Sequence, residues 1–185
     1  HLIDRNYKEE IDPSQSFTEK IIELAYLYRK RLISLIANWM RVGYCQGNFN
    51  SDNCAAGGFT LDYGPFGFCE LFDPRFQPWT GGGEHFSFFN QPLAAEINFK
   101  MFCSSLSPLL LDNKEDMERL EQIRNDFSKL MSKEIQLMWA KKLGLENNNE
   151  LLTNELLKLM VLSKADYTIF FRKLSHIPEN ISVLK

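Results

Sequence analysis

The chain has 185 residues, of which 44% are hydrophobic and 24% charged, and its formal net charge is −3. This length and composition suit a globular domain with a substantial core, and the slightly acidic balance argues against a broad nucleic-acid-binding or membrane-binding surface. The longest apolar runs, such as 106–111, are far too short to span a membrane.

The first ten residues, HLIDRNYKEE, have neither the apolar core of a secretory signal nor the composition of a transit peptide. They read as if the chain began within a longer protein. None of the four cysteines forms a C-x-x-C pair, and only three histidines are present. A zinc site therefore has little support. Reduced thiols packed as small apolar groups are expected instead, at Cys45, Cys54, Cys69 and Cys103.

A long helix is predicted from about Ser16 to residues 41–43. Ser16 and Glu19 fit the S-x-x-E capping box, and apolar residues then recur at helical spacing over a wide stripe. Trp39 and Met40 fall on this stripe and are expected to pack in the core.

Residues 44–83 show no helical period and hold eight of the ten glycines. Short apolar pieces such as Phe59–Leu61 suggest brief strands between tight turns. An irregular segment of this length inside a compact domain is usually functional or disordered, and its many aromatic residues argue against disorder. We therefore expect a functional loop anchored by aromatic side chains.

The remainder of the chain is predicted to be helical. Pro92 suits a first turn and Gly144 a helix end, with a surface loop at 147–150. The helices are expected at about 92–106, 114–143, 151–162 and 166–174. Lys141 and Lys142 are expected on a solvated face, and His85 in an exposed loop. The fold class is thus mainly α, with helices around a glycine-rich loop.

Two lone carboxylates stand out in the glycine-rich loop, in Asp52-Asn53 and in Asp62-Tyr63-Gly64. Protein kinases follow a catalytic-loop Asn with a short strand and then D-F-G, and the Asn and the D-F-G Asp hold magnesium on the nucleotide. Asn53 and Asp62 fit this order and supply the hard oxygen ligands that Mg²⁺ prefers. Gly64 would let the backbone turn directly after the ligand.

The same alignment puts Gln46, Gly47 and Asn48 in the places of the kinase His, Arg and catalytic Asp. Asn48 cannot act as a base, so Asp52 is the carboxylate left in the loop to orient or deprotonate an acceptor hydroxyl. No Lys or Arg occurs in 44–68, which leaves a metal without competing cations. The spacing alone leaves a second interpretation open, in which Asp52 and Asp62 make purely structural turns.

Four stretches closely resemble the selenoprotein O family. They are WMRVGYCQGNFNSDN (39–53), LDYGPFGF (61–68), FFNQP (88–92) with Asn98, and KADYTIFFRKLS (164–175). The resemblance runs from Leu2 to Ser175. It implies a kinase-like fold that binds ATP in a flipped orientation and transfers AMP to Ser, Thr or Tyr hydroxyls of proteins.

Carried over by motif, the resemblance makes Asp52 the catalytic base and Asn53 and Asp62 the ligands of Mg²⁺ or Mn²⁺. Asn53, Asp62, Tyr63 and Gly64 would together bind the nucleotide. Phe66 and Phe68 could line that site, although packing of the loop is the simpler expectation. The segment Asn90-Gln91-Pro92 is expected to brace the loop without a chemical role.

Two positions depart from the family pattern: Gln46 replaces its His, and Ile97-Asn98 its Trp-Asn pair. No Gly-rich loop or phosphate-binding Lys of an N-lobe is found. We therefore expect residues 1–185 to form a single kinase-like C-lobe domain, a fragment without the N-lobe and the family's C-terminal region. It should be monomeric and bind ATP poorly without the N-lobe. The expected compartment is mitochondrial in a eukaryote and cytoplasmic in a bacterium. Two alternatives stay open, a kinase that transfers the γ-phosphate and a non-catalytic scaffold.

Overall fold

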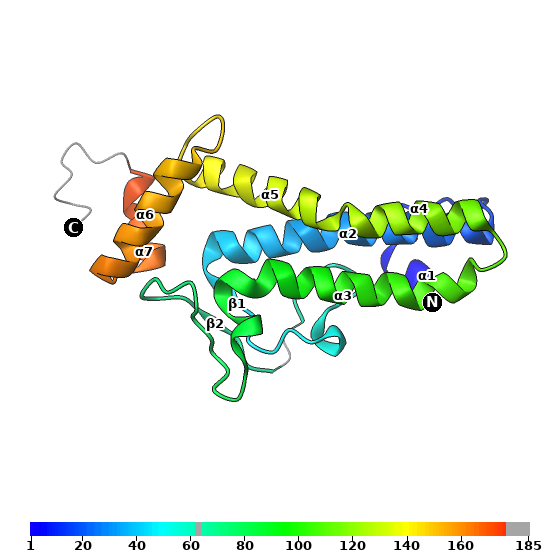
Figure 1. Cartoon of the computed structure of the whole chain (residues 1–185), viewed down its shortest axis with the longest axis horizontal. Coiled ribbons are helices and arrows are strands. Elements are labelled where there is room, and N and C mark those ends of the chain that lie inside the picture. Colours follow the sequence, from blue (N-terminus) through cyan, green and yellow to red (C-terminus); the bar gives the residue numbers. More distant parts are fainter. Residues whose placement is uncertain (62–63, 177–185) are drawn as a thin grey trace. The chain divides into compact units, whose positions relative to one another are not determined.

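The computed structural model describes residues 1–61 and 64–176, and its described part is mainly helical with a two-stranded sheet (Figure 1). This agrees with the mainly helical, kinase-like C-lobe predicted from the sequence. The chain divides into two compact units, which are described separately: residues 1–36, 49–63 and 92–132 form the first, and 37–48, 64–91 and 133–185 the second.

The predicted helices are confirmed with small shifts of their ends, except that the one expected over 114–143 forms two helices. Their bounds are α1 (Leu2–Asn6), α2 (Phe17–Val42), α3 (Gln91–Leu106), α4 (Lys114–Asn125), α5 (Phe127–Lys142), α6 (Glu150–Ser163) and α7 (Tyr167–Leu174). The strands are β1 (Tyr44–Cys45) and β2 (Gly67–Phe68). The short helix α1 was not anticipated. The strand suggested at Phe59–Leu61 was wrong: those residues are irregular, and β2 lies further along the glycine-rich segment.

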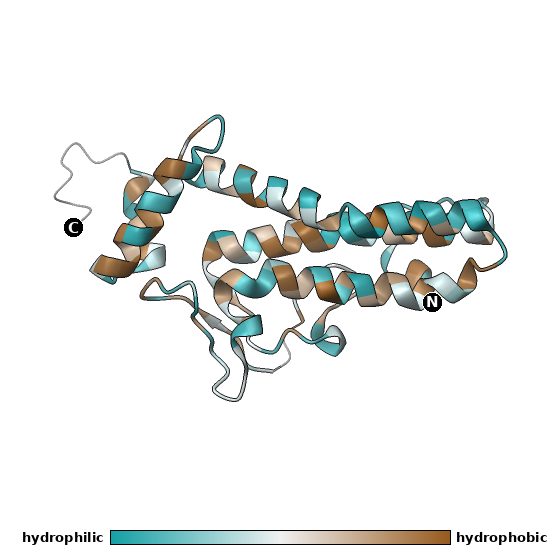
Figure 2. Cartoon of the chain, viewed as in Figure 1, coloured by the Kyte–Doolittle hydropathy of each residue, from teal (hydrophilic) through white to brown (hydrophobic). Residues whose placement is uncertain are grey.

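The first unit packs aromatic residues between α2, α3 and the start of α5. The rings of Tyr28 and Phe99 lie 5.8 Å apart, and Phe99 stacks on Phe127 at 4.9 Å. All three side chains are buried. By contrast α4 is predominantly hydrophilic, with Leu120 among its few buried residues (Figure 2).

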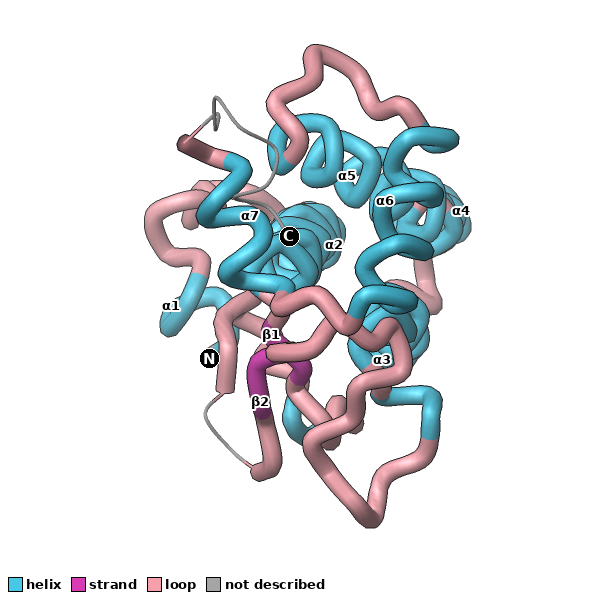
Figure 3. Tube along the Cα trace, turned by 90° about the vertical axis from the view of Figure 1, so that its left-hand side faces the viewer, coloured by secondary structure: helices cyan, strands magenta, loops and turns pink. Residues whose placement is uncertain are grey.

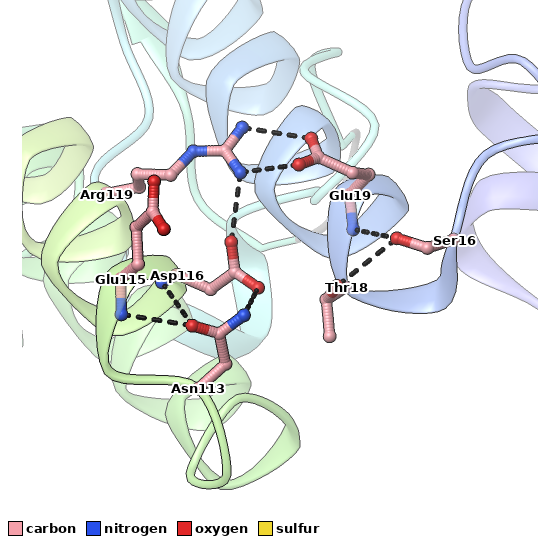
Figure 4. Close-up of polar contacts among 7 residues, drawn as sticks. All are labelled: Ser16, Thr18, Glu19, Asn113, Glu115, Asp116 and Arg119. Carbon is pink, nitrogen blue, oxygen red and sulfur yellow. Dashed lines mark hydrogen bonds and ion pairs between the residues drawn. The ribbon is translucent and has the colours of Figure 1, made fainter.

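The start of α2 is tied to α4 by polar contacts (Figure 4). The Ser16 hydroxyl accepts a hydrogen bond from the backbone N–H of Glu19 at 3.2 Å, as the capping box predicted. The Glu19 carboxylate instead receives two hydrogen bonds from Arg119, at 2.6 and 2.9 Å. Arg119 also donates to Asp116 at 2.9 Å. The side chain of Asn113 caps α4 by accepting hydrogen bonds from the backbone N–H groups of residues 115 and 116.

The helix predicted over 114–143 is interrupted at Asp126. Arg29 of α2 is buried, and its Nη1 donates to the carbonyl of Ile123 at 2.9 Å. A continuous helix would use that carbonyl to accept the amide of Phe127. Competition for this acceptor, together with the Arg29–Asp126 ion pair at 3.9 Å, accounts for the break.

The second unit is organised around Tyr167. Its ring packs against Phe72 and Phe88 at 5.6 and 5.7 Å, and its hydroxyl donates to the Met40 carbonyl at 2.8 Å. Trp39 and Met40 are buried as predicted. Strands β1 and β2 pair antiparallel, with Tyr44 opposite Phe68 and Cys45 opposite Gly67 (Figure 3).

The environment of Lys142 differs from the solvated face that was predicted. Lys141 is exposed as predicted, but Lys142 is only partly accessible. Its Nζ donates to the Arg41 carbonyl at 2.6 Å and lies 3.8 Å from the centroid of the Phe171 ring. The aromatic residues that cover it come from α7, so the pattern of α5 alone could not reveal the contact.

All four cysteines are free thiols, as expected. Three are buried, and burial raises the pKa of Cys45 to about 11 and that of Cys103 to about 12. These are packed, unreactive groups. No helix in the described part of the chain is long and apolar enough to cross a membrane.

Candidate active site

Asp52 and Asn53 share one turn of 3-10 helix, Ser51–Asn53, in the first unit. The backbone N–H of Asn53 donates a hydrogen bond to the Asn50 carbonyl at 3.0 Å. The two side chains differ in environment: Asn53 is buried, whereas Asp52 is exposed. Within the described residues, the Asp52 carboxylate has no hydrogen-bond or ion-pair partner. The turn thus presents the accessible carboxylate of Asp52 next to the buried side-chain amide of Asn53.

Buried contacts hold the chain on both sides of this turn. Before it, Asn98 Nδ2 donates to the Phe49 carbonyl at 2.9 Å. After it, the Tyr28 hydroxyl lies 3.1 Å from Cys54 Sγ. Burial raises the pKa of Tyr28 and that of Cys54, so both groups stay protonated at neutral pH. Helices α2 and α3 therefore position the Asp52-Asn53 turn from inside the first unit.

The residues preceding the turn are braced in the second unit. Gln46 is buried; its Oε1 accepts from the Tyr44 hydroxyl at 2.5 Å, and its backbone amide donates to Gln91 Oε1 at 2.9 Å. Gln91 is fully buried and donates to the carbonyls of Tyr44 and Phe88 at 2.9 and 3.2 Å. The predicted bracing role of 90–92 is thus confirmed at Gln91.

Gly47 is a constraint that sequence reasoning missed. Its φ is +75°, and a Cβ built there would lie 2.4 Å from the Pro65 carbonyl oxygen. Gln77 Nε2 donates to the Gly47 carbonyl at 3.2 Å. The available signal was a glycine in the place of the kinase Arg, where only the absence of a side chain allows the close approach.

Of the D-Y-G segment, Asp62 and Tyr63 lie outside the described residues. Gly64, in the second unit, has φ +87°, the left-handed region that glycine favours. Phe66 and Phe68 are about half-exposed and contact the Tyr44 ring at 5.7 and 5.6 Å, which supports the packing interpretation of these rings. His85 is exposed, as predicted.

Within the described residues, no three His, Cys, Asp or Glu side chains are grouped so that they could hold a metal ion. The predicted pair is of another kind, one amide oxygen from Asn53 and one carboxylate from Asp62. Such hard oxygen donors fit Mg²⁺ or Mn²⁺, which take few protein ligands and complete their shell with phosphate and water. The donor chemistry of the pair therefore fits the ion.

Comparison with known proteins agrees with the resemblance. Residues 1–183 match the family model described as protein adenylyltransferase SelO. The chain is 33% identical over 189 residues to protein nucleotidyltransferase YdiU of Flavobacterium johnsoniae, and 36% identical over 152 residues to the protein of that name from Nitrosospira multiformis. It is 33% identical over 180 residues to the mitochondrial protein adenylyltransferase SelO-1 of Danio rerio.

These matches cover 98%, 79% and 95% of the chain but 34%, 26% and 24% of the respective relatives. The chain thus spans about a third or less of the curated relatives that it matches. The family match nevertheless extends over almost every residue, including the loop that carries Asp52, Asn53 and Asp62. The chain belongs to the protein adenylyltransferase SelO family.

Proposed function

We propose that the chain carries the catalytic loop of a protein adenylyltransferase, which moves AMP from ATP to Ser, Thr or Tyr hydroxyls of other proteins. The acceptor oxygen forms a bond to the α-phosphorus of ATP. The bond from that phosphorus to the bridging oxygen of the β-phosphate breaks, and pyrophosphate leaves. The acceptor's proton passes to the Asp52 carboxylate.

The observation that carries this proposal is the contrast between Asp52 and Asn53. Asp52 is exposed, and its carboxylate has no partner in the described part of the chain, so a substrate hydroxyl can reach it. A general base needs this access before its pKa matters. Asn53 is buried on the same turn, which suits a ligand that must hold one orientation.

We assign Asn53 and Asp62 to Mg²⁺ or Mn²⁺, and Tyr63 and Gly64 to the nucleotide beside it. When bound, the ion would neutralise charge on the phosphates and help to align them. Asn48 is an amide where kinases carry their catalytic Asp, which disfavours γ-phosphate transfer. Because 44–68 contain no Lys or Arg, charge that neutralises the triphosphate must also come from outside this loop. We therefore expect the 185-residue chain alone to bind ATP weakly and to transfer little AMP.

The test uses the protein at its natural length with Mg²⁺ or Mn²⁺ and ATP labelled at either the α- or the γ-phosphate. Protein labelling from α-labelled ATP only is expected. Asp52→Asn should abolish the labelling while ATP binding persists, and Asp62→Ala should weaken metal-dependent ATP binding itself. Ser51→Ala, on the same exposed turn, is the matched control and should keep the activity.

Label from γ-labelled ATP would replace the proposal with a kinase. Metal-dependent ATP binding without any label, across a panel of protein acceptors, would favour a non-catalytic scaffold. Activity that survives Asp52→Asn would remove Asp52 from the role of base.

A further inference from the structure

A cavity of about 320 Å³ lies within the second unit between the end of α2, the end of α5 and α7. Its basic and hydroxyl-bearing lining residues are Arg41, Lys142, Arg172, Thr168 and Ser175. The aromatic side chains of Tyr167 and Phe171 complete much of the wall. None of these residues takes part in the catalytic loop.

The three cations of this cavity are not neutralised by the described part of the chain. No ion pair joins Arg41, Lys142 or Arg172 to a carboxylate there. Elsewhere, Arg29, Arg31 and Arg119 each pair with an acid. Cations that share a cavity without a counter-charge repel one another, and an anion that enters relieves this repulsion.

Of the three cations, Lys142 is the most removed from water, since Arg41 and Arg172 are exposed. It lies over the rings of Tyr167 and Phe171, with Nζ 4.6 and 3.8 Å from their centroids. Within the described residues, its ammonium group donates one hydrogen bond, to the Arg41 carbonyl. An ammonium group has three protons to donate, so it retains donors for a ligand.

We propose that this cavity is a binding site for a phosphate-type oxyanion, held by Arg41, Lys142 and Arg172 with the hydroxyl of Thr168; the Ser175 hydroxyl already donates to the Arg172 carbonyl at 2.7 Å. The donors of three cations and one hydroxyl exceed what the two oxygens of a carboxylate can accept, whereas a phosphate offers three or four oxygens. The aromatic wall favours a phosphate attached to an aromatic group over a free one.

The test titrates the 185-residue chain with inorganic phosphate, pyrophosphate and phenyl phosphate by isothermal titration calorimetry. The variants are Lys142→Met and Arg172→Met, each with an adjacent exposed lysine as its control, Lys141→Met and Lys173→Met. Each pair removes one positive charge from neighbouring positions of one helix, so a long-range charge effect would weaken binding similarly in both members. Met keeps the length and apolar contacts of Lys142, and circular dichroism checks folding.

Saturable binding that weakens roughly tenfold or more in Lys142→Met and Arg172→Met, but little in the controls, is expected. If phenyl phosphate binds more tightly than inorganic phosphate, the source of the anion is a phosphorylated aromatic group. If the two bind with equal affinity, the source is free phosphate. Absence of saturable binding in the millimolar range would overturn the site. Binding that the four variants weaken equally would do the same.

Discussion

The side-chain amide of Asn98 donates to the backbone carbonyl of Phe49 at 2.9 Å, although the two residues are 49 positions apart. Both are buried, and Phe49 stands two residues before the turn that carries Asp52 and Asn53. A helix of the first unit thereby fixes the entrance to the loop that carries the proposed base.

Replacing Asn98 by alanine should therefore destabilise the chain. The substitution leaves a buried carbonyl without its donor, which costs about 1–3 kcal/mol. Urea denaturation, monitored by circular dichroism, measures the decrease in the free energy of unfolding. Asn154→Ala is the control, because Asn154 is an exposed asparagine inside α6. Equal stabilities of the two variants would contradict the bracing role of Asn98.

Gln91 should be still less replaceable. Its side chain satisfies three buried backbone groups, the amide of Gln46 and the carbonyls of Tyr44 and Phe88. Gln91→Met keeps the length of the side chain but removes every one of these bonds, and a loss of about 2 kcal/mol or more is expected. Gln136→Met, at an exposed position of α5, is the control. If Gln91→Met denatured at the same urea concentration as the wild type, the bracing role of Gln91 would be refuted.

Two glycines near the proposed site should respond differently to alanine. At Gly47 a Cβ would meet the Pro65 carbonyl oxygen at 2.4 Å, and φ is +75°, so strain and overlap add to about 3 kcal/mol or more. At Gly64 φ is +87°, but no atom lies within 4 Å of the added Cβ. Gly64→Ala should cost only the conformational strain of about 1–2 kcal/mol. Thermal denaturation of both variants compares them directly, and a larger loss at Gly64 would be inconsistent with this geometry.

The positions of the long helices follow from sequence because periodicity and caps are local. The Ser16 cap, the end of α2 before Gly43 and the start of α3 beside Pro92 are all properties of adjacent residues. Interruption of the helix at Asp126 is not local, since it depends on Arg29, 97 positions earlier. The environment of Lys142 likewise depends on α7.

The candidate site divides in the same way. Residue type and order pointed to Asp52, Asn53 and Asp62, and the family resemblance gave them roles. The structure adds what a linear pattern cannot contain, namely that Asn53 is buried while Asp52 is exposed. The side-chain braces from Asn98 and Gln91 needed the fold, because each joins residues at least 45 positions apart.

The Glu19–Arg119 pair predicts a response to acid. Its hydrogen bonds with Arg119 hold the pKa of Glu19 below the ordinary value of 4.5. A lowered carboxyl pKa contributes stability that is present above the unfolded-state pKa and is lost as the pH falls through the folded-state value. Glu19→Gln should therefore melt below wild type at pH 7, and the difference should shrink below about pH 4. Glu118→Gln, an exposed acid on α4, is the control, and a pH-independent difference for Glu19→Gln would contradict the pair's contribution.

Lys142 predicts a response at alkaline pH. Burial, with repulsion from Arg41, lowers its pKa from 10.5 to about 8. Between these two values the unfolded chain binds more protons at this site than the folded chain, so the contribution of Lys142 to stability rises with pH through that window. Thermal denaturation of Lys142→Met and wild type from pH 7 to 10.5 isolates this contribution from the titration of cysteines and tyrosines. Lys142→Met should be the more stable at pH 7, by on the order of 1 kcal/mol, and the advantage should fade towards pH 10. Lys141→Met should follow wild type throughout, and a constant difference between Lys142→Met and wild type across this range would show that Lys142 is charged at neutral pH at no cost to the fold.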